Sequence, residues 1–135
     1  MKKIARIIIC LLLGGILVGC DVIEDRSEKI KDIDFTVVAP RDIPEELMKE
    51  IDVKKGNVFK ITYSEGDSLY ICVGYGKQST GGYSVMVEDL YLTKNAIYID
   101  TELLAPAPGE VVANAVSYPY VCIKLEYIDK TVVFD

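Results

Sequence analysis

The fold class can be recognised from the stretch NVFKITYSEGDSLYICVGY, residues 57–75. Its first half alternates as a β-strand does, with Val58, Lys60 and Thr62 on one face and Phe59, Ile61 and Tyr63 on the other. Its second half is apolar and would place Leu69, Ile71, Val73 and Tyr75 on one face. Residues 64–67, Ser-Glu-Gly-Asp, are typical of a hairpin turn. The stretch therefore predicts two antiparallel strands, over 57–63 and 69–75.

Five further strand-like runs flank this pair. They lie at residues 33–38, 82–92, 96–101, 118–127 and 131–134. They are short, closely spaced and rich in Val, Ile and Tyr, a pattern that favours antiparallel pairing. We therefore expect a mainly β fold of about seven strands, either an antiparallel sandwich or a partly closed barrel. Residues 33–135 would form this single domain.

One short helix is expected before most of these strands, over residues 44–53. Asp42 can cap it, Pro44 suits its first turn, and the two glutamates that follow complement the helix dipole. Apolar residues recur four apart on one face, at Ile43, Leu47 and Ile51. The run Lys54-Lys55-Gly56 is a stop signal. The apolar stripe indicates contact with the core rather than a partner site.

The N-terminus has the layout of a secretory signal peptide, with a basic start and an apolar run over residues 7–18. The run ends in Leu17-Val18-Gly19-Cys20, which resembles the lipobox of bacterial lipoproteins. That resemblance implies diacylation of the Cys20 thiol and cleavage before it. The run has only 12 residues, whereas a transmembrane helix needs about 20. We expect a signal peptide over 1–19, a flexible tether over 20–32, and attachment to the extracytoplasmic face of the cell membrane.

Composition narrows the class of function. Processing before Cys20 would remove three basic residues, so the net charge would go from −6 to −9. So acidic a chain does not attract nucleic acid, and its natural complement is a basic protein surface. The chain has no histidine, which removes Ser-His and Cys-His nucleophile pairs and histidine zinc sites. We therefore expect no enzyme activity, no catalytic residue, no metal, no cofactor and no small-molecule substrate.

Two cysteines, Cys72 and Cys122, remain after processing and lipidation. Outside the cytoplasm these two could form a disulfide. The alternative is that both are small apolar side chains buried in strands. A count of free thiols under denaturing conditions distinguishes the two.

Three loops are rich in Gly, Pro and Tyr and poor in charge, at residues 75–83, 104–109 and 117–120. Each loop taken singly suits ordinary turn chemistry. Together they are typical of a recognition edge, because tyrosine supplies a large contact area at little entropic cost. The candidate partner-binding residues are Gln78, Thr80, Gly81, Gly82, Tyr83, Pro106, Pro108, Gly109, Tyr118, Pro119 and Tyr120.

The same loops carry a family resemblance. The segments GKQSTGGYSV (76–85), PAPGE (106–110) and VSYPYV (116–121) resemble the C-terminal domain of PrcB-like proteins. The likeness covers about residues 69–125. The family is named for a lipoprotein subunit that stabilises a cell-surface protease complex. The resemblance therefore implies a non-catalytic, membrane-anchored accessory protein that binds a protease.

A weaker likeness concerns the order of the loops. Residues 80–83, 105–110 and 118–120 are similar to the three loops that chagasin-type cysteine-protease inhibitors present at one end of an Ig-like sandwich. The pair Gly81-Gly82 and the absence of tryptophan depart from that pattern. These departures from the inhibitor pattern favour docking to a protease over its inhibition.

We thus expect a lipid-anchored protein-binding module, an accessory or stabilising subunit of an extracytoplasmic protease complex. One alternative is a direct protease inhibitor that uses the loops at 78–83, 105–110 and 117–120. Another is a structural envelope lipoprotein with no protease connection. In the first two functions the partners are the membrane, through the N-terminal lipid, and a protein.

Overall fold

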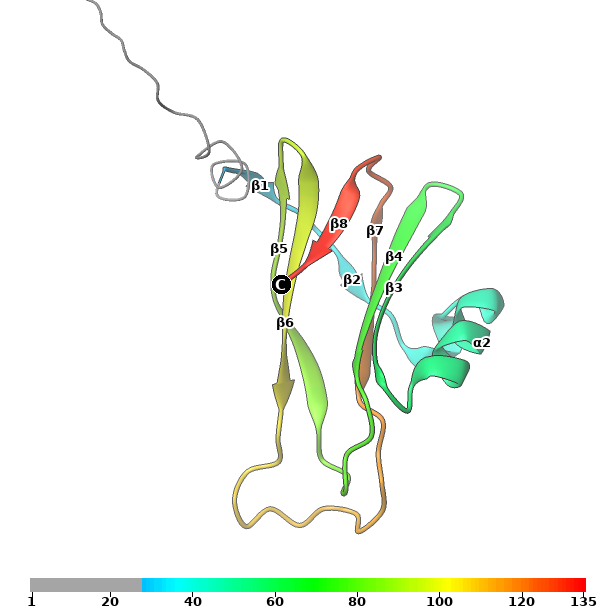
Figure 1. Cartoon of the computed structure of the whole chain (residues 1–135), viewed down its shortest axis with the longest axis vertical. Helices are drawn as coiled ribbons and strands as arrows, with labels where there is room; N and C mark the ends of the chain where they lie inside the picture. Colours follow the sequence, from blue (N-terminus) through cyan, green and yellow to red (C-terminus); the bar gives the residue numbers. More distant parts are fainter. Residues whose placement is uncertain (1–27) are drawn as a thin grey trace, which may run out of the picture.

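The computed structural model describes residues 28–135 (Figure 1). The expected signal peptide, Cys20 and the first part of the expected tether lie outside the described residues. The described chain forms eight strands and one α-helix. In order they are β1 (Lys29–Asp32), β2 (Thr36–Val37), α2 (Glu45–Lys54), β3 (Val58–Glu65), β4 (Ser68–Tyr75), β5 (Ser84–Thr93), β6 (Ala96–Leu104), β7 (Tyr120–Glu126) and β8 (Thr131–Phe134).

The strands form two sheets that face each other (Figure 1). The first sheet, which we call the β5 sheet, has the order β1-β5-β6-β8, and the second, the β4 sheet, has the order β2-β7-β4-β3. All neighbouring strands are antiparallel except β6 and β8. The mainly β class is confirmed, and the sandwich is the observed one of the two expected architectures.

The N-terminal strand differs from the expectation. The expected strand at 33–38 is only Thr36–Val37, and Lys29–Asp32, assigned to the tether, forms β1 at the edge of the β5 sheet. The chain crosses between the two sheets after Ile33, whose N–H still donates to the Leu90 carbonyl at 3.0 Å. Lys29–Asp32 therefore belongs to the β domain and not to the expected tether. The exposed, charged β1 has no apolar pattern, and its pairing with β5 is all that makes it a strand.

The inner core lies between the sheets, on the predicted face of β4. Side chains from both sheets meet there: Leu69, Ile71, Val73, Leu90, Ile97, Ile99, Val121, Ile123 and Leu125. Tyr75, at the end of β4, crosses this layer, and its hydroxyl lies 2.7 Å from the Thr101 hydroxyl of β6. The hairpin between β3 and β4 is also confirmed, since Glu65 pairs with Ser68 around a glycine with φ of 59° at Gly66.

A third layer is formed by α2, which covers the outer face of the β4 sheet (Figure 1). Leu47 and Ile51 are fully buried against the sheet, so the predicted stripe is confirmed as core. The predicted cap is wrong, because Asp42 belongs to a short 3₁₀ turn, η1 (Pro40–Asp42), and Pro44 occupies the capping position without a side-chain bond. Within residues 28–135 no helix is long and apolar enough to span a membrane.

Candidate functional site

The expected recognition loops gather at one end of the sandwich, below β5 and β7 in Figure 1. Gln78 and Ser117 exchange backbone hydrogen bonds at 2.8 and 3.0 Å. The Gly81 N–H donates to the Ala113 carbonyl at 3.0 Å, and the Ser117 hydroxyl donates to the Thr80 carbonyl at 2.7 Å. The loop of residues 76–83 is therefore tied to the connection that runs from β6 to β7.

The chain after β6 also contacts the loop of residues 76–83, at Gly82. Gly82 has φ of 90°, a conformation that favours glycine. A Cβ atom at Gly82 would lie 2.6 Å from Val112 Cγ1 and 3.0 Å from Pro106 Cβ. The close approach of these three residues therefore requires the absence of a side chain at position 82.

A hollow of about 410 Å³ opens beside these loops. No Asp, Glu, Lys or Arg lines it. One wall is the start of β5 with the residue before it, and the other wall is the start of β7 with the chain around β2. The lining residues are Val37, Val38, Ala39, Pro40, Tyr83, Ser84, Val85, Tyr118, Pro119, Tyr120, Val121 and Cys122. An uncharged hollow with three tyrosines suits contact with a protein chain.

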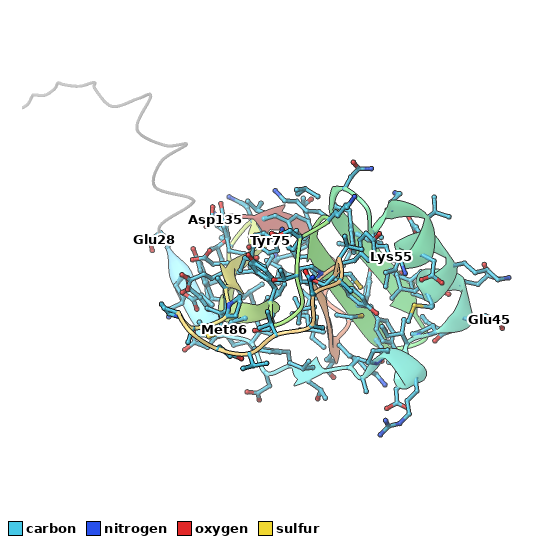
Figure 2. The ribbon with its side chains drawn as sticks, turned by 90° about the horizontal axis from the view of Figure 1, so that it is seen from below. Glu28, Glu45, Lys55, Tyr75, Met86 and Asp135 are labelled. Carbon is cyan, nitrogen blue, oxygen red and sulfur yellow. The ribbon has the colours of Figure 1, made fainter. Side chains whose placement is uncertain are left out.

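Two of the tyrosines are held by the helix layer. The Tyr120 ring lies 6.3 Å from the Phe59 ring, and burial raises the pKa of its hydroxyl. The ammonium group of Lys55, at the end of α2, lies 5.4 Å from the centre of the Tyr118 ring. Figure 2, which looks onto the loop end, shows Lys55 on the α2 side and Met86 of β5 toward the opposite flank. The packing of α2 thus positions one wall of the hollow.

The structure brings only some of the candidate residues into the hollow. Tyr83, Tyr118, Pro119 and Tyr120 line it. Five others make the contacts between the loops, namely Gln78, Thr80, Gly81, Gly82 and Pro106. Pro108 and Gly109 are exposed in a separate turn, in which the Glu110 N–H donates to the Ala107 carbonyl at 3.0 Å. The residues predicted as one binding set therefore divide into a lining set and a set that shapes the loops.

Sequence reasoning missed the part of the second wall that comes from the chain around β2. Val37, 61% exposed, and the residues up to Pro40 face Tyr83 across the hollow. No local pattern marks them, because their position depends on β2 pairing with β7. Val111, 96% exposed, was also missed, although it belongs to an apolar run without strand alternation, VVANAV at 111–116.

Cys72 and Cys122 are register partners on β4 and β7, and both are buried as free thiols. The Cys122 carbonyl accepts from the Val38 N–H at 2.8 Å, so its backbone points to β2 rather than to β4. The cysteines therefore form a non-hydrogen-bonded pair, the kind that brings side chains closest. Hydrogen bonding with the Cys122 thiol and burial raise the pKa of Cys72. The structure thus has the two cysteines as buried free thiols. The disulfide stays a prediction, which a count of free thiols under denaturing conditions would test.

The fold and the hollow define a class of protein: a small β-sandwich with an uncharged, tyrosine-lined hollow at one end. Residues 69–126 match the family model described as PrcB C-terminal, so the chain carries a PrcB-like domain over this range. The match runs from β4 to the end of β7 and contains Tyr83 and Tyr118–Tyr120. It confirms the resemblance expected over 69–125. No curated protein and no solved structure gives a match.

Proposed function

We propose that this chain is a lipid-anchored, non-catalytic protein-binding module that serves as an accessory or stabilising subunit of an extracytoplasmic protease complex. The hollow lined by Tyr83, Tyr118 and Tyr120 carries the proposal, because these three tyrosines lie within the matched PrcB-like segment. Tyrosines in a recessed, uncharged site are favoured as anchors in protein interfaces. A binding role needs no histidine, and the chain has none.

The position of the hollow suits an anchored protein. β1 begins at the opposite end of the sandwich, where Lys29 pairs with Thr93, whereas the hollow lies beside Ser84. The ten residues of β5 span about 33 Å between these ends. A lipid on Cys20 would therefore hold the hollow away from the bilayer and toward a neighbouring protein. Anchoring in one membrane would also raise the local concentration of that partner.

Direct inhibition of a protease is a second candidate, and the shape of the site favours docking over it. An inhibitory loop inserts into a cleft, whereas this loop end has a hollow, a shape that suits receiving part of a partner. An assay of the full chain in detergent against papain-like and subtilisin-like proteases separates the two. Inhibition at micromolar concentration would support the inhibitor, and its absence excludes that role for these protease classes.

The test of the docking site is recovery of the partner from solubilised membranes by the tagged full chain. Tyr83→Ala combined with Tyr118→Ala removes two rings from the hollow, and we expect at least a tenfold loss of recovery. The matched control is Tyr63→Ala with Tyr127→Ala, which removes two rings outside the hollow. Equal recovery by the two double variants, both with wild-type melting behaviour, would overturn the docking site. Recovery of no protease component by the wild type would favour the structural envelope role.

Anchoring is tested separately by metabolic labelling with a fatty-acid analogue. The wild-type chain should take up label, and Cys20→Ala should take up none. Label on the Cys20→Ala variant would contradict the proposed anchor without bearing on the docking site.

A further inference from the structure

The edge of β5 is only half covered. β1 pairs with β5 from Tyr91 to Thr93, and Ile33 extends the contact to Leu90. The chain then leaves for the other sheet, where Thr36 and Val37 pair with β7. From Ser84 to Glu88 the edge makes no backbone hydrogen bond to any residue in the described range. The sheet switch thus leaves about five residues of strand edge unpaired, in the half of β5 nearer the loop end.

Space lies along this open edge. The hollow of about 410 Å³ flanks its start, at Ser84 and Val85. A second hollow, of about 250 Å³, flanks its end, at Val87 and Glu88, and has Ile33 and Phe35 on its other side. The two hollows follow one strand from Tyr83 to Leu90. An extended chain there would occupy the place that β1 leaves when it crosses to the β4 sheet.

The side chains along the edge specify what would fit. Val85 and Val87 are half-buried and face the inner core, where an added strand would place every second residue. The second hollow is lined by three carboxylates, at Asp32, Glu88 and Asp89, and by no Lys or Arg. Asp32 pairs with Lys29 at 2.9 Å, whereas Glu88 and Asp89 form no ion pair within residues 28–135. Charge complementarity therefore calls for a basic residue at this end.

The edge strand β3 is protected against pairing with another chain, whereas the open part of β5 is less protected. On β3, the ammonium group of Lys60 lies 5.7 Å from the Phe134 ring on β8, so the lysine points into the sandwich. An inward-pointing charge on an edge strand discourages pairing with another chain. The stretch Ser84–Leu92 contains no Lys, Arg or Pro, and its one irregularity is the bulge between Val87 and Asp89. The open part of β5 is thus available for pairing up to that bulge.

We propose that the Ser84–Glu88 edge of β5 binds an extended segment of the partner protein as an added strand of the β5 sheet. The segment has apolar residues at alternate positions, which face Val85 and Val87, and a Lys or Arg beside Glu88 and Asp89. Main-chain hydrogen bonds supply affinity in this mode, and the alternating side chains supply specificity. The inference rests on the proposed docking function and names the kind of partner segment that the hollow receives.

The direct test is amide hydrogen exchange on the full chain in detergent micelles, with the acetylated peptide Lys-Val-Thr-Val-Thr as probe. Paired antiparallel to β5, as β1 is, this peptide places its valines beside Val87 and Val85 and its lysine beside Glu88. Strand addition slows exchange within Ser84–Glu88 by tenfold or more at millimolar peptide. A peptide with Glu in place of Lys should bind at least fivefold more weakly. Unchanged exchange at Ser84–Glu88 with the Lys peptide, or equal binding of the two peptides, would overturn the proposal.

A pair of variants separates this inference from the docking function. Val87→Lys puts an inward charge on the open edge, as Lys60 does on β3, whereas Val53→Lys adds the same charge at an exposed position of α2, outside the edge and the hollow. We expect Val87→Lys to abolish peptide protection and partner recovery and Val53→Lys to retain both. Full recovery by Val87→Lys, with loss in the double tyrosine variant, would overturn strand addition and keep the docking function. If Val87→Lys does not fold, the exchange result on the wild-type chain decides.

Discussion

At the scale of single residues, Gly82 shows how the loop end of the sandwich depends on distant parts of the chain. The pair Gly81-Gly82 suggests a flexible turn, yet Gly82 is enclosed by Pro106 and Val112, about 25 to 30 residues further along. Its φ of 90° and this enclosure both require glycine. Gly109 has a similar φ of 84°, but a Cβ atom there would meet nothing within 4 Å. A comparison of the two glycines therefore distinguishes the effect of the backbone conformation from the effect of the enclosure.

We predict that Gly82→Ala destabilises the domain more than Gly109→Ala. The backbone strain common to both should cost about 1–2 kcal/mol. The contact with Val112 and Pro106 adds to that cost only at Gly82, by about 1–3 kcal/mol as overpacking does elsewhere. Urea unfolding of both variants measures the difference. Equal unfolding free energies would contradict the prediction, because they would show that the enclosure of Gly82 by Val112 and Pro106 adds nothing to the cost of the substitution.

At the scale of elements, the outer face of β5 and β6 carries like charges in contact. The bulge between Val87 and Asp89 brings Glu88 beside Glu102, and hydrogen bonding with Glu102 followed by its negative charge raises the pKa of Glu88. A raised carboxyl pKa in the folded state favours folding when the group is protonated. The contribution is present below the ordinary value of 4.5 and is lost as the pH rises through the raised pKa.

Glu88→Gln should therefore raise the melting temperature at pH 7 by a small amount, since both carboxyl groups are solvent-exposed. The gain should shrink to nothing as the pH falls below about 4, where the raised pKa leaves Glu88 protonated in the wild type. Melting curves between pH 3 and pH 8 measure it, with Glu126→Gln on the other sheet as control. A gain that is the same at every pH would contradict the charge explanation.

At the scale of the whole molecule, the two cores share their central strands. β4 sends Ile71 into the core between the sheets and Cys72 toward α2, and β7 does the same with Ile123 and Cys122. Because β4 and β7 contribute side chains to both cores, disruption of one core also disturbs the strands that form the other. We therefore expect the helix layer and the sandwich to unfold together.

Leu47→Ala in the helix layer and Ile99→Ala between the sheets should each cost about 2–5 kcal/mol. Both should shift one transition, seen at the same denaturant concentration by far-ultraviolet circular dichroism and by tyrosine fluorescence. Val53→Ala on the exposed side of α2, where the residue is 82% exposed, should change the unfolding free energy by less than about 0.5 kcal/mol. Loss of helix signal at lower denaturant than the fluorescence change would show that α2 is an independent layer.

Local pattern was enough for the parts of the fold that depend on near neighbours. The two-residue alternation in 57–75 correctly predicted β3, β4 and the face of β4 that forms the inner core. The four-residue spacing of Leu47 and Ile51 predicted the buried side of α2. The loop sequences predicted the PrcB-like domain. These properties follow from strand and helix geometry within one segment, or from a sequence motif, so a single stretch of chain is sufficient to show them.

The remaining features depend on which segments lie side by side. The crossing of the chain from β1 to β2, the facing of Cys72 and Cys122, and the open edge at Ser84–Glu88 are all matters of pairing between distant strands. Backbone groups carry that pairing, and they are the same in every residue except proline, so side-chain pattern does not report it. The wall at Val37–Pro40 and the enclosure of Gly82 likewise exist only once distant segments have packed together.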